Sequence, residues 1–179
     1  GRSITDEVIE AHTLQDTYTF NGMSRPAVGF PYREDSNIVA IKWRSVGSGD
    51  KFYSQENVCQ DFFNLDGYVS GNDLLLVEGE IDALSWLSCD LPENLTVLSI
   101  PNGAPSKVKD GKVDPKDDVK FRYVWRAKKQ LESAERIILC FDSDEPGVAL
   151  RDEIVRRVGT DKIWLVDLDD YKDTNEALT

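Results

Sequence analysis

Four nearly continuous apolar runs alternate with helical segments from residue 73 onward, and this alternation constrains the fold more than any other feature. The runs are DLLLV (73–77), LTVLSI (95–100), RIILCF (136–141) and KIWLVDL (162–168). Apolar residues at helical spacing predict helices over 80–88, 118–134 and 145–158. The second of these helices would bury Val119, Tyr123, Val124, Ala127 and Leu131. Strands without polar alternation need cover on both faces, so the pattern predicts an α/β fold with a mostly parallel four-stranded sheet and flanking helices.

Residues 1–70 have a different pattern of short, alternating segments, which begins with a possible helix within 1–16. NIVAIKWRS (37–45) predicts a strand with Ile38, Ala40 and Trp43 on one side, and KFYSQ (51–55) predicts the returning strand of a hairpin. PAVGFPY (26–32) holds two prolines, which indicates extended chain that is edge-like at best. We therefore expect a small, mostly antiparallel β subdomain over 1–70, followed by the α/β domain over 71–179.

Composition narrows the class of protein. The net charge of −12 argues against nonspecific nucleic-acid binding by the whole chain, and no apolar run is long enough to span a membrane. The cysteines Cys59, Cys89 and Cys140 form no CxxC, and His12 is the sole histidine, so a structural zinc site is excluded and a reducing, intracellular compartment is favoured. Residues 105–129 carry nine basic and four acidic residues. That segment is either a binding surface for a polyanion or a solvated helix with a charged loop.

Acidic residues follow three of the four predicted strands. Glu78 ends the first run, Asp142 and Asp144 follow the third, and Asp173 lies shortly after the fourth. The carboxyl ends of parallel strands meet at one edge of a sheet, which is where such sheets bind ligands. Repulsion among these groups would cost several kcal/mol unless cations neutralise it. Oxygen ligands without histidine or cysteine favour Mg²⁺ or Mn²⁺.

Helix capping offers a second explanation for several of these acids. Asp144 is placed to cap the helix that follows it, and Asp173 with Glu176 fits a capping arrangement. Glu80 and Asp82 lie in a first helical turn, where the macrodipole favours negative charge. We regard Glu80 as the acid best explained in this way. Glu78 and Asp142 resist the explanation, because each directly follows an apolar strand and precedes its helix by two or more residues.

The motifs resemble those of a known family. VEGEIDALS resembles the glutamate motif of the Toprim domain, and FDSDEPG resembles its Asp-x-Asp motif. SIPNGA (99–104), KDTNEAL (172–178) and the two predicted hairpin strands resemble the primase half of phage T7-type primase–helicases and of Twinkle. The resemblance implies a DNA-dependent RNA primase core, a nucleotidyltransferase that condenses ribonucleotides into primers on single-stranded DNA. It also implies a helicase domain, in the same longer chain or as a partner.

The resemblance also implies roles for individual residues. Two Mg²⁺ or Mn²⁺ ions would be held by five acids: Glu78, Asp82, Asp142, Asp144 and Asp173. Three of them, Glu78, Asp142 and Asp144, would also be catalytic. Lys42, Arg44 and Lys51 would contact template or nucleotide phosphates, and Asn102 and Gly103 would lie near the nucleotide. For the basic trio, exposed positions on a hairpin face are the simpler alternative.

Two expected modules have no counterpart in the sequence: there is no Cys/His set for a zinc module and no GxxxxGK[ST] loop for a helicase motor. The chain therefore resembles the central part of a longer protein, and primer synthesis without the zinc module is an open question. A Toprim nuclease or topoisomerase fragment, and a non-catalytic Toprim module that binds single-stranded DNA or a helicase, remain as alternatives. A receiver domain fits the glutamate motif poorly. A bacterial or phage-infected cytoplasm is favoured over a mitochondrion.

Overall fold

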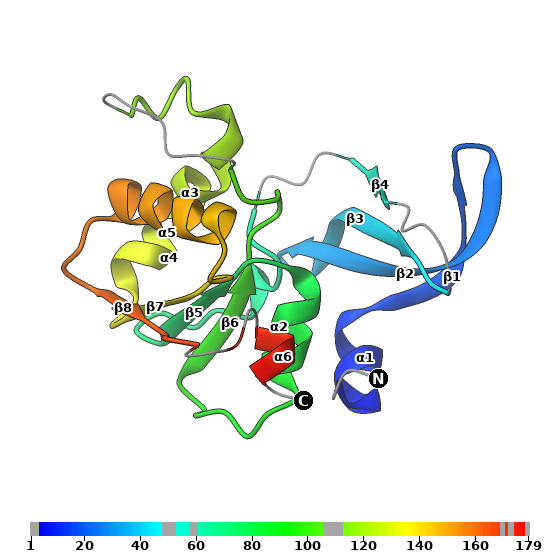
Figure 1. Ribbon diagram of the computed structural model, residues 1–179, viewed down its shortest axis with the longest axis horizontal. Coiled ribbons are helices and arrows are strands. Elements are labelled where there is room, and N and C mark those ends of the chain that lie inside the picture. The colour runs from blue at the N-terminus through cyan, green and yellow to red at the C-terminus, as the bar shows by residue number, and fades with distance from the viewer. Residues whose placement is uncertain are drawn as a thin grey trace.

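A computed structural model describes residues 4–47, 53–57, 61–105, 113–168, 171 and 174–177. The chain forms two four-stranded sheets, one antiparallel with the order β1-β2-β3-β4 and one parallel with the order β6-β5-β7-β8 (Figure 1). The predicted fold class, a parallel sheet with flanking helices preceded by a small antiparallel β unit, is confirmed. The predicted division near residue 70 falls between the last antiparallel strand and the first parallel one.

The antiparallel sheet follows helix α1 (Asp6–His12) and is built from consecutive hairpins. Its strands are β1 (Leu14–Phe20), β2 (Met23–Glu34), β3 (Asn37–Ser45) and β4 (Tyr53–Glu56). Asn21-Gly22 and Asp35-Ser36 form the first two turns, and all four residues have positive φ. Two-residue turns with positive φ match the twist of paired strands, and they fix the register of both hairpins.

The prediction that 26–32 is edge-like was wrong, because β2 lies between β1 and β3. Its two prolines are tolerated because each lies where β2 has a registered partner on one side alone: Pro26 opposite Thr17 of β1, and Pro31 opposite Ile41 of β3. β2 is thus a central strand. The backbone N–H groups that its two prolines lack fall near the ends of the stretch in which β2 pairs with β1 and β3 at once.

Strand β3 was assigned correctly, but its predicted buried face was wrong. Ala40 and Trp43 are buried in different clusters, and Ile38 is 43% exposed. Side chains alternate along a strand, so residues 40 and 43 point to opposite sides of the sheet. Ala40 packs with Phe30 against the parallel sheet, whereas Trp43 stacks on Tyr18 in a small outer cluster.

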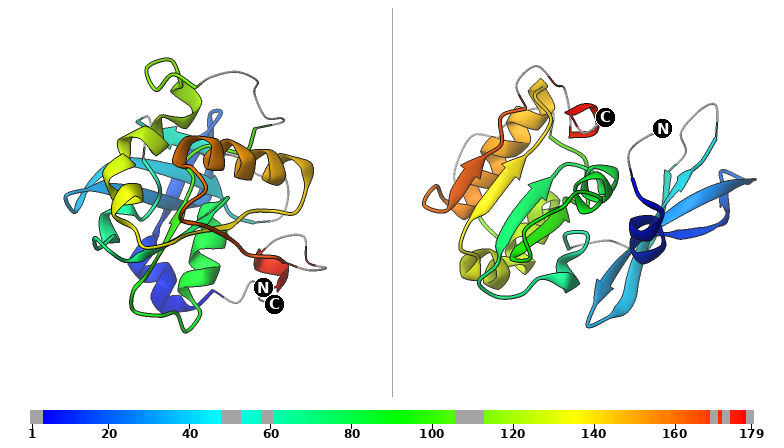
Figure 2. Two further views of the ribbon diagram at one scale, coloured as in Figure 1. Left: turned by 90° about the vertical axis from the view of Figure 1, so that its left-hand side faces the viewer. Right: turned by 90° about the horizontal axis from the view of Figure 1, so that it is seen from below.

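The parallel sheet is assembled as predicted, with helices on both faces. Its elements are β5 (Asp73–Val77), α2 (Glu80–Leu87), β6 (Leu95–Ser99), β7 (Ile137–Cys140), α5 (Glu145–Val158), β8 (Ile163–Leu165) and α6 (Thr174–Ala177). Leu74 and Leu76 point to the face covered by α5, and Leu75 and Val77 point to the face covered by α2 and the antiparallel sheet. Figure 2 shows the antiparallel strands on the α2 side of the parallel sheet.

The predicted helix over 118–134 is broken into three pieces. A 3₁₀ turn, η2 (Val119–Phe121), precedes α3 (Arg122–Arg126) and α4 (Lys128–Ser133), which are separated at Ala127. The 3₁₀ turn changes the rotation per residue, so Phe121 is buried and Val119 is 65% exposed, contrary to prediction. The other four predicted positions are buried.

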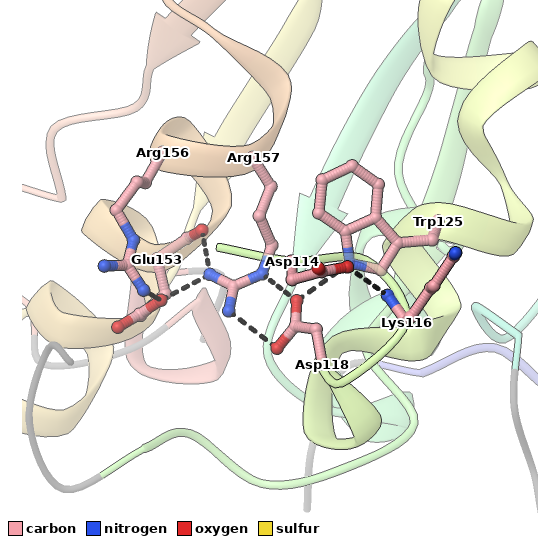
Figure 3. Close-up of polar contacts among 7 residues, drawn as sticks. All are labelled: Asp114, Lys116, Asp118, Trp125, Glu153, Arg156 and Arg157. Atoms are coloured by element: carbon pink, nitrogen blue, oxygen red, sulfur yellow. Dashed lines mark hydrogen bonds and ion pairs between the residues drawn. The ribbon is translucent and has the colours of Figure 1, made fainter. Parts of the chain in front are cut away.

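An ion network fixes the start of this broken helix. Asp118 accepts hydrogen bonds from Trp125 Nε1 at 2.8 Å and from Arg157 Nε at 2.7 Å, and Arg157 also pairs with Glu153 (Figure 3). The Arg157 guanidinium lies 3.7 Å from the centre of the Phe121 ring. These contacts join the segment before α3 to the last turns of α5, away from the carboxyl edge of the sheet.

The predicted fourth strand (162–168) is shorter than expected. β8 spans three residues at the edge of the sheet, where Trp164 and Leu165 are more than half exposed. An edge strand has a neighbour on one side alone, so its apolar sequence does not imply burial. None of the helices in the described part of the chain is long and apolar enough to cross a membrane.

Candidate active site

Glu78 and Asp82 flank the turn from β5 into α2. Gly79 is the N-cap of α2, and its backbone N–H donates to Asp82 Oδ2 at 3.1 Å. A Cβ at position 79 would lie 3.0 Å from the same oxygen. The glycine therefore lets the chain turn closely over Asp82. This tight turn holds Glu78 at the end of β5.

Asp142 and Asp144 occupy the equivalent turn from β7 into α5. Asp144 is the N-cap of α5, and its Oδ1 accepts the Gly147 N–H at 3.1 Å, so the capping role predicted for it is confirmed. A Cβ at Gly147 would lie 2.1 Å from the Asp142 carbonyl oxygen. The first turn of α5 thus packs directly on the backbone of Asp142, an approach that glycine permits.

The strand register brings these acids together. Val77 is registered with Cys140, so the residues after β5 and β7 emerge side by side. Burial, followed by repulsion from Asp142, Asp144 and Asp82, raises the pKa of Glu78 from an ordinary 4.5 to about 7, against the opposing hydrogen bond from the Asp142 backbone N–H. Four predicted site carboxylates therefore share one electrostatic environment.

The donor chemistry of this cluster fits a hard cation. Glu78 Oε2 is buried and has no hydrogen-bond partner, a costly state for a carboxylate oxygen. A divalent cation held by oxygen ligands would satisfy this atom and reduce the mutual repulsion. Among the residues that the structure describes, however, no group of three or more acidic, histidine or cysteine side chains is arranged to hold a metal ion. Asp173 lies outside the described residues, so the metal site remains a prediction.

The predicted basic residues Lys42 and Arg44 lie on β3, on the face that carries Ala40. Lys42 is registered with Phe30, and Arg44 with Val28. The Lys42 ammonium donates to Glu80 Oε1 and, at 2.9 Å, to the Pro101 carbonyl oxygen. The antiparallel sheet thus places this lysine at the carboxyl edge of the parallel sheet. Lys51 lies outside the described residues.

Asn102 and Gly103 follow β6 at the same edge. Both residues are exposed, and a Cβ at position 103 would meet nothing within 4 Å. Local crowding therefore does not account for the glycine. Their predicted contact with a nucleotide stays a prediction.

Within the basic segment 105–129, the structure describes residue 105 and residues 113–129. There, Lys116, Lys120, Arg122, Lys128 and Lys129 are exposed. Arg126 pairs with Asp61 at 2.9 Å and lies 3.7 Å from Glu34. At least one cation of the segment, Arg126, therefore has a structural partner, whereas the exposed lysines fit either a solvated surface or a binding surface for a polyanion.

Sequence patterns missed two residues of this region, Tyr32 and Glu80. Glu80 is buried, and the hydroxyl of Tyr32, which is 2% exposed, donates to its Oε1. The position of Glu80 in the first turn of α2 was the sole available signal, and it indicated a helix-dipole role. Its two partners come from strands far away in the sequence, which no local pattern reveals.

Comparisons with known proteins agree with this architecture. Residues 121–178 match the family described as Toprim-like. The chain is 29% identical to the Twinkle homolog protein, chloroplastic/mitochondrial, of Arabidopsis thaliana over 99% of its length, and 31% identical to the Primase homolog protein of the same plant over 84%. It covers 28% and 45% of those relatives, respectively.

A solved structure extends the likeness to three dimensions. The crystal structure of the primase fragment of the bacteriophage T7 primase–helicase protein superposes with a TM-score of 0.73 at 24% identity. The superposition covers 98% of this chain and 65% of the T7 fragment. At this level of identity, the likeness concerns the fold.

Proposed function

Because the chain carries a primase-type Toprim domain and resembles the primase core of the T7-type primase–helicase and Twinkle family, we propose that it is a DNA-dependent RNA primase core. It would condense ribonucleotides into short primers on single-stranded DNA, as part of a longer protein. The chain spans less than half of the curated relatives it matches, so this proposal concerns the region and not a whole protein.

One observation carries the proposal: four carboxylates share an edge of the parallel sheet with a lysine supplied by the antiparallel sheet. Burial, together with repulsion from the neighbouring acids, raises the pKa of Glu78, and a bound cation is the simplest way to offset the cost of its charge. Lys42 reaches the same edge, because its ammonium donates to Glu80 in the first turn of α2 and to the Pro101 carbonyl oxygen after β6. Nucleotidyl transfer requires acidic side chains that hold metal ions and, next to them, a positively charged side chain that contacts phosphates.

The proposed roles are those that the family resemblance implies for the individual residues. Glu78, Asp82, Asp142 and Asp144, with Asp173, would hold Mg²⁺ or Mn²⁺. When bound, such ions make the primer 3′ hydroxyl more acidic and neutralise charge on the leaving pyrophosphate. The elevated pKa of Glu78 also suits proton transfer near neutral pH. Lys42 and Arg44, together with Lys51, would contact phosphates of template or nucleotide, and Asn102 and Gly103 would approach the nucleotide through backbone groups.

The direct test is primer synthesis on single-stranded DNA with labelled ribonucleotides and Mn²⁺. Wild-type protein should make short RNA, and Asp142→Asn should abolish synthesis at a melting temperature no lower than that of the wild type. Asp90→Asn, which makes the same chemical change at an exposed position after α2, is the matched control and should remain active. Activity of Asp142→Asn at the wild-type level would refute the assignment of Asp142.

A non-catalytic module that binds single-stranded DNA or a helicase is the second candidate. It is favoured by the lack of a ready metal-ligating group among the described residues. A mobility shift without RNA products would support it, whereas loss of the DNA itself would support a Toprim nuclease.

The relatives also support proposals about partners and compartment. Helicase activity would lie in the same longer chain or in a partner, as it does in the T7 primase–helicase protein. One relative is described as chloroplastic/mitochondrial, which supports an organelle as the alternative to the cytoplasm. Fractionation of the source cells would decide between them.

A further inference from the structure

A buried polar cluster joins the two sheets beside the carboxylates. Tyr32 of β2 and Lys42 of β3 both donate to Oε1 of Glu80, the first residue of α2. Lys42 also donates to the Pro101 carbonyl oxygen, directly after β6. We call Tyr32, Lys42, Glu80 and Pro101 the lysine anchor. Its members come from three separate elements of the fold and from the loop after β6.

The lysine anchor restricts the Lys42 ammonium in a particular way. An ammonium has three N–H donors and no acceptor. Two of these donors are taken by acceptors on α2 and after β6, and the lysine side chain is still 24% exposed. The direction of the third donor is therefore set by the protein before any ligand arrives. A free lysine side chain would have to lose rotamer entropy to reach one such direction.

Stability alone gives a poor explanation for the lysine anchor. Buried ion pairs are often no more stabilising than well-packed apolar residues of similar volume. The two sheets already share an apolar cluster in which Phe30 and Tyr32 pack with Phe63, Val77 and Leu84. Glu80 also cancels the charge of Lys42, so the pair adds little general attraction for anions. What the arrangement supplies is a fixed direction for the Lys42 ammonium.

We propose that Glu80 is a positioning residue for Lys42, that Tyr32 fixes Glu80, and that the third ammonium donor binds a phosphate oxygen of a nucleotide at the carboxylate edge. This inference rests on the proposed nucleotide chemistry of the site. A phosphate oxygen is the fitting acceptor because lysine binds phosphate as a point charge and because the site lies beside groups suited to phosphate-bound cations.

Kinetics separate positioning from structural support. Glu80→Gln keeps the size of the side chain and an acceptor oxygen but removes its charge, so the hydrogen bond from Lys42 loses its charge assistance and holds the ammonium less firmly in one direction. The kcat of primer synthesis should fall about tenfold or more, because small misplacements are costly in catalysis, while KM for nucleotide stays within about threefold or decreases. Glu80→Asp should recover part of the loss in kcat, and Tyr32→Phe should lower kcat less than Glu80→Gln does. The exposed Glu93→Gln is the matched control and should behave as wild type.

A structural role would produce a different pattern. In that case the loss of kcat would follow the loss of folded protein, and assays carried out well below the melting temperature of the variant would restore kcat. Wild-type kcat and KM in Glu80→Gln would also overturn the proposal. If Glu80→Gln does not fold, the same comparison is made with Tyr32→Phe, which keeps the packed ring and removes only the hydroxyl.

A readout without catalysis keeps this inference distinguishable from the proposed function. In ¹⁵N-lysine-labelled protein, a hydrogen-bonded Lys42 ammonium should give a protected resonance that is absent from Lys42→Arg and less protected in Glu80→Gln. Added ATP with Mg²⁺ should shift it. If wild type makes no RNA but this pattern holds, the primase proposal fails and the positioning of Lys42 toward nucleotide stands. A resonance indifferent to Glu80→Gln or to ATP would refute the positioning role.

Discussion

Replacing Glu78 with glutamine should stabilise the metal-free protein, and more so as the pH rises. Below about pH 4.5 the carboxyl is protonated in both the folded and the unfolded chain. Between 4.5 and the folded-state pKa of about 7, the folded chain alone keeps the proton, so stability falls as the pH rises. Above pH 7 the folded chain carries the full cost of a charge that is partly buried and repelled by Asp142, Asp144 and Asp82.

The size of this effect follows from the pKa shift. A rise from 4.5 to about 7 corresponds, at about 1.4 kcal/mol per pKa unit, to roughly 3 kcal/mol at pH 8. Glu78 is partly exposed, and solvent screening reduces the expected gain from Glu78→Gln to about 1–2 kcal/mol. For a chain of this length, the melting temperature should rise by roughly 3–6 °C.

Thermal unfolding followed by circular dichroism, in EDTA at pH 5 and pH 8, measures the difference. The gain should be large at pH 8 and small at pH 5. Glu93→Gln, which removes the same charge from an exposed loop position, should change little at either pH. An equal effect of Glu78→Gln at both pH values, or a loss of stability at pH 8, would refute the idea that Glu78 is held in a repulsive, buried site.

Three further predictions concern the supports of the site. Asp144→Ala should lower the free energy of unfolding in EDTA by about 1 kcal/mol through loss of the α5 N-cap, whereas Asp144→Asn should retain most of the stability that the cap provides. Equal losses for the two variants in urea titrations would exclude capping. Gly147→Ala puts a Cβ 2.1 Å from the Asp142 carbonyl oxygen, so stability should fall by about 2 kcal/mol and Mn²⁺ affinity by calorimetry should weaken; wild-type values for both would contradict the crowding. Arg157→Met breaks the ion pairs of Figure 3 around a side chain that is 2% exposed and should cost about 3 kcal/mol in thermal unfolding, whereas a neutral result would mean that the network is dispensable.

Much of the parallel sheet could be predicted because its signals are local. The run LLLV before Glu78 and the run IILC before Asp142 each specify a buried strand within a few residues. Parallel order then places both acids at one edge, whatever the detailed packing. The errors arose where local signals are ambiguous. Two prolines concealed the central strand β2, and an apolar periodicity through Val119 concealed the 3₁₀ turn that Asp118 and Arg157 hold in place.

By itself, the sequence determined the succession of strands and helices along the chain and the delivery of Glu78, Asp142 and Asp144 to the carboxyl edge of the parallel sheet, because hydrophobic periodicity and chain direction suffice for both. Only the tertiary structure decided what surrounds Lys42. Its partner Glu80 lies 38 residues away in the sequence, and the two meet because the β3 face with Ala40 packs on α2 and β5. Contacts of this kind depend on how two sheets lie against each other, and local sequence carries no record of that geometry.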